Sequence, residues 1–241
     1  MSTGAVTATL TYQHPRDFVF KNMRVAIARG GTQLYSAAVD SRFCKGCAPY
    51  LAPAGKAALG ARDLDGDGEP EVTLDLWTGG AHCCYLLQVF HFDTATGSYA
   101  KVEQTFYDYG YKLRGANVFV SADGRFDYDF TSFAASGVPV QVWRYSGGVF
   151  TDVTRSYPAL IRRDAAKWFR YYRKDARRHL DVKGFLTAWA ADEFLLGHRR
   201  RAVKTLRRAV RRHEVRSDIF EKRKHFVRDV LRLLRRTGYA S

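Results

Sequence analysis

The sequence predicts an α+β protein in which strands and helices are segregated, with an N-terminal all-β domain and a C-terminal all-α helical bundle. Residues 5–154 contain roughly ten short β-branched and aromatic runs separated by turn residues. From Pro158 onward, apolar residues recur at helical spacing instead. The charge changes at the same place: residues 155–241 hold 26 Lys and Arg against 9 Asp and Glu, whereas residues 1–154 hold 13 against 15. We therefore expect two domains, 1–154 and 155–241.

The N-terminal part has the turn chemistry of antiparallel sheets. Short regular spacing and glycine turns are typical of an antiparallel meander, a sandwich or a propeller-like domain. Three pairs of runs are joined by turns that favour hairpins. These pairs are Val19–Ala28 with Thr32–Val39, Asn117–Ser121 with Arg125–Thr131, and Pro139–Tyr145 with Val149–Val153.

The C-terminal part predicts four short amphipathic helices. Their apolar positions fall within residues 160–172, 182–195, 202–210 and 220–234. Four such helices with short connections form a small bundle or stacked helical hairpins.

Composition limits the class of protein further. The chain has 241 residues, a hydrophobic content of 46% and a formal net charge of +15. This is a globular composition, and no run reaches the roughly 20 apolar residues that cross a bilayer. The start, Met1–Tyr12, has neither the basic nor the apolar region of a signal peptide.

An acidic loop, Asp63-Leu-Asp-Gly-Asp-Gly-Glu-Pro-Glu71, carries the clearest chemistry. Asp63, Asp65 and Asp67 offer carboxylates at positions 1, 3 and 5, and the intervening glycines let the backbone turn sharply. Glu69 can offer its main-chain carbonyl and Glu71 its side chain. Calcium binds six to eight such oxygens. We expect a structural Ca²⁺ here, because acidic groups this close repel one another without a cation.

The loop is not an EF-hand, since position 12 is Leu74 and both flanks look extended. The nine-residue pattern resembles the calcium loops of FG-GAP/VCBS repeats, the integrin-α-like propeller blades. The resemblance implies ligands from the first, third, fifth and ninth side chains and from the seventh carbonyl. It covers about one blade, so it implies the loop rather than a complete propeller.

Further motifs resemble a group of uncharacterised actinobacterial exported proteins with one such loop. These are Gly79-Gly-Ala-His-Cys-Cys84, Trp143-Arg-Tyr-Ser-Gly-Gly148 and Arg236-Thr-Gly-Tyr239. Because the group is uncharacterised, the resemblance implies no activity for this chain, but it does imply export. We therefore expect a secreted or cell-envelope protein whose signal peptide has been removed, with a cytoplasmic location as the alternative.

The four cysteines form two pairs, Cys44 with Cys47 and Cys83 with Cys84, and His82 adjoins the second pair. An even count together with export favours disulfides, and we expect at least one bond between the two segments. A zinc site is a weaker alternative, because consecutive side chains on a strand point to opposite faces. A thiol redox centre is a further alternative, although such a C-x-x-C normally opens a helix.

The predicted third helix carries a basic face. It consists of Arg200, Lys204, Arg207, Arg208 and Arg211. Such a face is either merely solvated or a contact for anionic cell-envelope polymer or lipid headgroups. No base-reading motif accompanies it, so nucleic acid is a less favoured partner.

These observations predict a calcium-binding, non-enzymatic binding or adhesion module of the cell envelope. No Ser/His/Asp arrangement and no paired catalytic carboxylates stand out in the sequence. One alternative is an envelope hydrolase, or a thiol or zinc protein, that uses His82 and the cysteines. Another is a nucleic-acid-binding protein that uses the basic helices.

Overall fold

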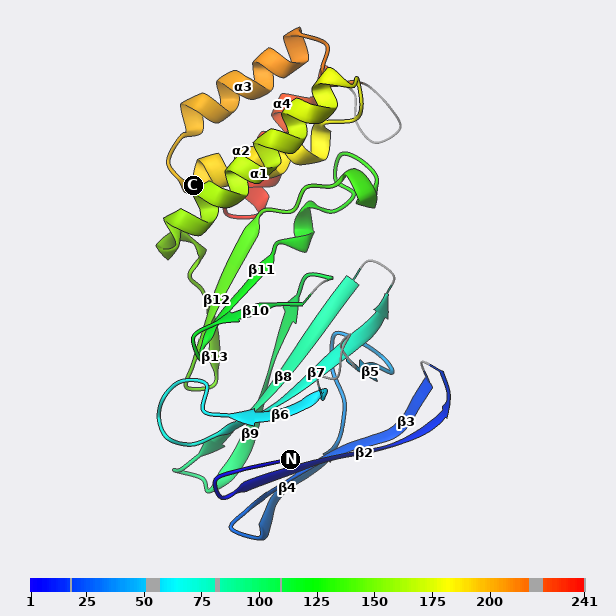
Figure 1. Cartoon of the computed structure of the whole chain (residues 1–241), viewed down its shortest axis with the longest axis vertical. Helices are drawn as coiled ribbons and strands as arrows, with labels where there is room; N and C mark the ends of the chain where they lie inside the picture. The colour runs from blue at the N-terminus through cyan, green and yellow to red at the C-terminus, as the bar shows by residue number, and fades with distance from the viewer. Residues whose placement is uncertain (18, 51–56, 81–82, 109, 217–222, 241) are drawn as a thin grey trace. The chain divides into compact units, whose positions relative to one another are not determined.

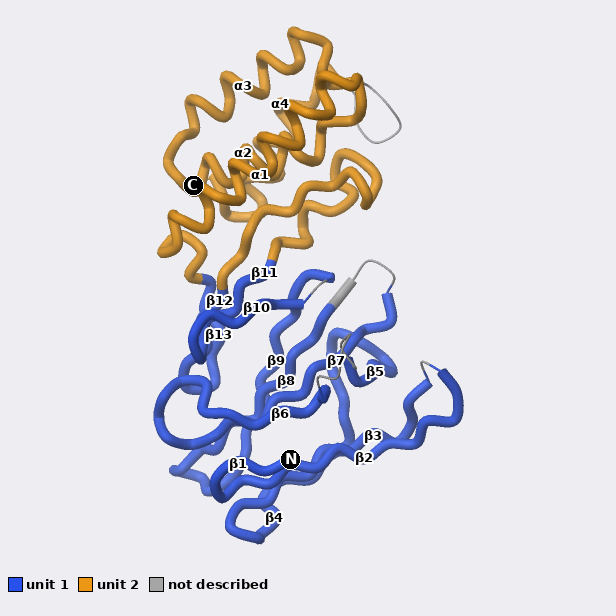
Figure 2. Tube along the Cα trace, viewed as in Figure 1, with its two compact units in different colours: residues 1–121, 143–152 blue, residues 122–142, 153–241 orange. Residues whose placement is uncertain are grey.

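The computed structural model describes residues 1–17, 19–50, 57–80, 83–108, 110–216 and 223–240, without the side chains of residues 83 and 84. Within these ranges, strands come first along the chain and the α-helices follow (Figure 1), as the segregated α+β class predicts. The chain forms two compact units (Figure 2). Unit 1 comprises residues 1–121 and 143–152, and unit 2 comprises residues 122–142 and 153–241.

Two antiparallel sheets form most of unit 1. The first follows chain order through β1 (Ser2–Thr3), β2 (Val6–Arg16), β3 (Val19–Arg29) and β4 (Thr32–Ala38). The second has the order β5 (Ala48–Pro49), β7 (Glu71–Gly80), β8 (Cys83–Asp93) and β9 (Ser98–Phe106), and β6 (Leu59–Arg62) also pairs with β7.

A third sheet joins strands that are distant in sequence. It contains β10 (Lys112–Arg114), β11 (Val118–Ala122), β12 (Val140–Ser146) and β13 (Val149–Asp152). The β12–β13 hairpin matches the predicted pair around Ser-Gly-Gly. Strand β12 begins in unit 2 and ends in unit 1, so the chain changes unit within this strand.

The second sheet is buried on both faces. Leu86 and Phe90 of β8 pack into a core shared with Val25 of the first sheet. Leu87 and Val89, which point the opposite way, belong to a separate cluster with residues of the third sheet. This explains why β8 reads as a nearly continuous apolar run, as strands covered on both sides do.

The described residues of unit 2 form four α-helices. These are α1 (Pro158–Arg177), α2 (Lys183–Leu195), α3 (Arg199–Arg211) and α4 (Phe226–Arg236). Helix α2 is buried almost all round, whereas α1, α3 and α4 bury one stripe each. Among the described residues, no helix is both long and apolar enough to cross a membrane.

Residues 122–142 correct the predicted strand at Arg125–Thr131. A short 3₁₀ helix, η1 (Gly124–Phe126), replaces it, because the Asp123 carboxylate accepts a hydrogen bond from the Arg125 N–H and caps the turn. Phe126 and Phe130 pack in the core of the helices. The segment therefore groups with the helical unit, and the division of the chain differs from a simple boundary at 154/155.

Candidate metal centre

The acidic loop closes a β-hairpin. Residues 63–70 connect β6 to β7, and Arg62 pairs with Glu71 across the two strands. Asp63 therefore follows the end of one strand while Glu71 begins the other. This register brings the first and ninth positions of the predicted loop to the same end of the hairpin.

The backbone of the loop turns around the Asp63 side chain. Its carboxylate accepts hydrogen bonds from the N–H groups of Gly66 at 2.6 Å and Gly68 at 3.1 Å. Both glycines have φ near +85°, at +84° and +89°, which residues with a side chain rarely adopt. Leu64 is buried in the core of unit 1 and anchors the loop. The turn predicted from the sequence is therefore present.

Three of the predicted ligands come together. Asp63, Asp65 and Glu71 each offer one carboxylate oxygen, and these oxygens lie within 4.8 Å of one another. Oxygens on opposite sides of a calcium ion, with bonds of about 2.4 Å, are separated by about 5 Å. The spacing thus fits oxygens that share one cation of this size.

Glu71 is the most buried member of the cluster, with 3% of its surface exposed. The pKa of Glu71 is raised to about 7, chiefly by burial and also by the charges of Asp65 and Asp67, against a hydrogen bond donated by the Leu64 N–H at 2.7 Å. An ionised carboxylate in this position is costly unless a positive charge offsets it.

Asp65 links the loop to another part of unit 1. Its Oδ2 accepts a hydrogen bond of 2.7 Å from the Gly147 N–H, in the turn between β12 and β13. Its Oδ1 is buried and has no hydrogen-bond partner in the described part of the chain. A buried carboxylate oxygen without a hydrogen-bond donor is available to coordinate a cation.

Asp67 and Glu69 lie outside this cluster of three. The exposed Asp67 accepts a hydrogen bond from the Glu69 N–H at 2.7 Å. The Glu69 side chain forms a bidentate ion pair with Arg29 of β3, with one N–O distance of 2.7 Å. The predicted contribution of Glu69 was its carbonyl, which this ion pair leaves available.

The structure adds two neighbours that sequence reasoning missed. Gly147 is 82 residues from Asp65, and no local pattern links them. Tyr145 is fully buried, and its pKa is raised first by burial and then by the charges of Glu71 and Asp65. A neutral phenol therefore borders the acidic cluster.

Cys44 is bonded to Cys47, which confirms a disulfide but corrects the expected pairing between segments. With both sulfurs used locally, neither cysteine can reach the second pair or supply a thiolate to zinc. The spacing of the cysteines alone could not distinguish the possible pairings. The local bond forms because the backbone bends at Lys45–Gly46 and brings Cys44 close to Cys47. Cys83 and Cys84 open β8, but their side chains and all of His82 lie outside the described residues.

We expect thiol-specific mapping of oxidised protein to recover a peptide containing a Cys44–Cys47 bond. Reduction should cost little stability, about 2 kcal/mol at most on the chain-entropy model, because the bond closes a very short loop. The Cys44→Ser/Cys47→Ser double variant is the control, since reduction should not destabilise it through this bond. Recovery of Cys44 joined to Cys83 or Cys84 would contradict the assignment.

The predicted basic residues lie on α3. Arg200, Lys204, Arg207 and Arg211 are exposed, whereas Arg208 is half-buried. The opposite side of the helix contributes Ala202, Leu206 and Ala209 to the core. The predicted face is therefore directed to solvent over most of its length.

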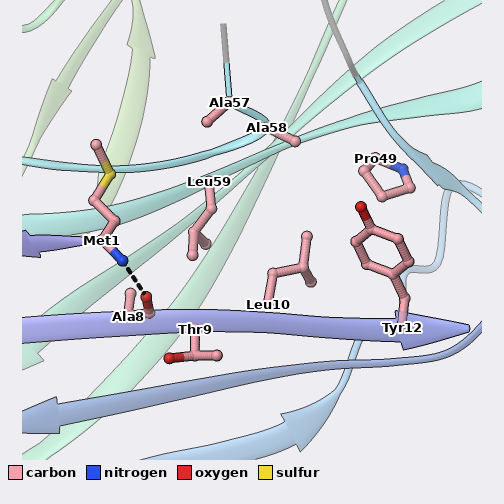
Figure 3. A pocket seen from close by; sticks show the side chains of 9 residues that line it. All are labelled: Met1, Ala8, Thr9, Leu10, Tyr12, Pro49, Ala57, Ala58 and Leu59. Carbon is pink, nitrogen blue, oxygen red and sulfur yellow. Dashed lines mark hydrogen bonds between the residues drawn. The ribbon is translucent and has the colours of Figure 1, made fainter.

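An apolar cavity of about 390 Å³ lies beside β2 (Figure 3). Leu10 and Tyr12 line it from β2 and Leu59 from β6, and the amino group of Met1 donates to the Ala8 carbonyl at 2.9 Å. None of its nine lining residues is an acid, a histidine or a cysteine. It offers no metal ligand set and no acid–base pair.

A second cavity, of about 400 Å³, has a mainly aromatic lining that includes Phe20, Tyr50 and Trp77. His14 also lines it, but its imidazole is stacked on Phe20 with ring centroids 4.4 Å apart. The ring thus forms part of the apolar wall. The acidic loop therefore remains the best-defined site in the described residues.

Comparisons with known proteins show a similarity to a cyanobacterial protein. Over 150 residues the chain is 29% identical to a probable thylakoid lumen protein of Synechocystis sp., a match that covers 58% of this chain and 44% of that protein. The chain thus spans less than half the length of this relative. No family model matches the sequence. No solved structure matches it either.

Proposed function

We propose that residues 63–71 bind a calcium ion with a structural role, in an exported binding module that has no catalytic activity. The observation that carries this proposal is the convergence of Asp63, Asp65 and Glu71, with one buried Asp65 oxygen left without a donor. All the donors are oxygens, which suits a hard cation rather than zinc. The Asp67 carboxylate and the Glu69 carbonyl are the proposed further ligands.

The ion would serve to hold separate strands together. Asp65 already contacts the turn between β12 and β13, and Glu71 opens β7. A cation held by both would fix the β6–β7 loop against the third sheet. A structural role follows from this position, because the oxygens lie between strands rather than in either cavity.

Two observations support the proposed export. The likeness to a probable thylakoid lumen protein associates part of the chain with a protein of a non-cytoplasmic compartment. The Cys44–Cys47 disulfide is typical of oxidising compartments. We propose a secreted or cell-envelope location on this basis.

The partner we propose for α3 is a polyanion of the envelope. Arg200, Lys204, Arg207 and Arg211 present four exposed cations along one helix, with Arg208 at its edge. Opposite charge attracts such partners without reading a sequence. The cell envelope is rich in phosphate and carboxylate groups, which arginine binds in a bidentate manner.

Calorimetric titration tests the calcium site directly. We expect the full chain to bind one calcium ion per molecule and the Asp63→Asn and Asp65→Asn variants to lose most of the binding, because each removes a charged ligand without changing side-chain volume. Asp40→Asn is the matched control, since Asp40 is an exposed acid paired with Lys101 away from the loop. Absence of binding by the parent chain at millimolar calcium would refute the proposal.

A further inference from the structure

Helix α1 carries a second row of basic side chains that the sequence patterns did not single out. The row is exposed along the whole helix and recurs at intervals of three, four and seven residues. It consists of Arg162, Arg163, Arg170, Arg173, Lys174 and Arg177. The opposite side of α1 buries Ile161, Ala165, Trp168 and Tyr172.

Helix α1 and the end of α3 approach each other at Tyr172. Tyr172 of α1 donates a hydrogen bond of 2.6 Å to Glu214, just beyond α3. Arg173 of α1 and Arg208 of α3 both lie close enough to this phenol to oppose the rise in its pKa, which burial causes first. Both arginines therefore lie near Tyr172, on the buried side of α1. We refer to the α1 row and the basic face of α3 together as the basic surface.

Three acidic residues of unit 2 pair with basic residues that are not part of this surface. Asp164 pairs with Lys167, Glu193 with Arg201 and Asp229 with Arg232. Within the described ranges, no salt bridge neutralises the six basic residues of the α1 row or the exposed four of α3. The positive charge of the basic surface is thus available to an external partner.

Two large apolar side chains are exposed at the border of the α1 row. Tyr171 is 41% exposed and lies one helical turn from Lys174, and Leu180 is 50% exposed just beyond the end of α1. The Tyr171 ring also contacts Phe185, with centroids 5.6 Å apart, so it is held in place. Tyrosine and leucine beside cations are typical of surfaces that enter the headgroup region of a bilayer.

We infer that the basic surface binds an anionic lipid bilayer, with the arginines on lipid phosphates and with Tyr171 and Leu180 at the boundary between headgroups and acyl chains. Eight of the ten exposed basic residues are arginine, which matches phosphate geometry. A soluble polyanion would satisfy the charges but would leave Leu180 in water. The inference extends the contact proposed for α3 and does not depend on calcium.

Vesicle co-sedimentation of the full chain, with EDTA present, tests the inference apart from the calcium loop. We expect binding to phosphatidylglycerol vesicles, weak binding to phosphatidylcholine vesicles and a steep loss with salt. Replacing Arg163, Arg170 and Arg177 with Gln should weaken binding on the order of 100-fold, because each basic residue near an anionic surface contributes about 1 kcal/mol. Gln is a comparable helix former, and circular dichroism checks that the helix remains.

A matched charge control separates the surface from the net charge. The triple variant Lys21→Gln/Arg42→Gln/Lys45→Gln removes three exposed cations from unit 1 and should bind nearly as the parent does. Equal weakening by both triple variants would overturn the inference, since binding would then follow overall charge.

Leu180→Ser distinguishes a bilayer from a soluble polyanion. We expect it to weaken binding to vesicles several-fold and to leave binding to long-chain inorganic polyphosphate unchanged. If Leu180→Ser binds vesicles as the parent does, the surface recognises phosphate in solution and the bilayer assignment is wrong. Lack of vesicle binding by the parent would refute it outright.

Discussion

Chelation of calcium is expected to lower the melting temperature of the protein. A ligand present at 100 times its Kd stabilises the folded state by about 2.7 kcal/mol through mass action. For a chain of this size that corresponds to roughly 5–10 °C. The physical reason is local: without a cation, Glu71 and Asp65 keep buried negative charge close together. Differential scanning calorimetry in calcium and in EDTA measures the shift.

The variant that isolates this effect is Asp65→Asn. Asparagine still offers an acceptor to the Gly147 N–H, so the contact between the loop and the β12–β13 turn can remain. We expect the calcium-dependent shift to disappear, while Asp40→Asn keeps it in full. A shift that persists in Asp65→Asn would place the bound calcium elsewhere in the protein.

A second large effect is expected at Asp192, in the last turn of α2. Asp192 is fully buried, and neither of its carboxylate oxygens has a hydrogen-bond partner among the described residues. Burial raises its pKa well above the usual range, and the neighbouring Asp164 and Glu193 raise it further, against Lys167. Tyr239 also lies close to it. Burial beside a second carboxylate therefore favours the protonated form of Asp192.

Asp192→Asn should therefore stabilise the protein, and increasingly so as pH rises. The folded state holds a proton on Asp192 that the unfolded chain releases above about pH 4, so this group favours folding less at each higher pH until its folded-state pKa is passed. Asparagine is neutral at every pH in this range and therefore carries no such proton cost. Chemical denaturation between pH 4 and pH 8 should show the two proteins converging at the acid end.

Asp229→Asn is the contrasting control. The Asp229 pKa is lowered, first by its hydrogen bond with Arg228, so its ionised form contributes stability at neutral pH that is lost in acid. The expected effect has the opposite sign and is small, because the ion pairs are at the surface. A loss of stability in Asp192→Asn that grows with pH would show that Asp192 is needed as an anion.

Local patterns predicted the order of elements well. Glycine turns and alternation located the β3–β4 and β12–β13 hairpins, and the change of period near Pro158 located α1. The convergence of Asp63, Asp65 and Glu71 could be predicted because these acids are at most eight residues apart, so the constraint is local. The predicted strand at Arg125–Thr131 was wrong, because the Asp123 side chain caps a 3₁₀ helix there. The sequence pattern alone cannot show whether the cap or the strand forms.

Long-range features could not be predicted from local sequence. The contact of Asp65 with Gly147 depends on how the sheets pack, and the pairing of Asp164 with Asp192 depends on how α1 crosses α2. The α1 basic row was visible as composition, but its exposure became apparent only when the burial of Trp168 and Tyr172 fixed the orientation of the helix.

The chain passes between the two units three times, between residues 121 and 122, 142 and 143, and 152 and 153. During synthesis, unit 1 therefore cannot complete its fold until residues 143–152 have left the ribosome, which happens only after residues 122–142 have been made. Dividing the gene at residue 154 would separate Phe126 and Phe130 from the helices with which they form a core. Recombination at a single junction could not transfer either unit intact to another gene, so the two units are expected to be inherited together.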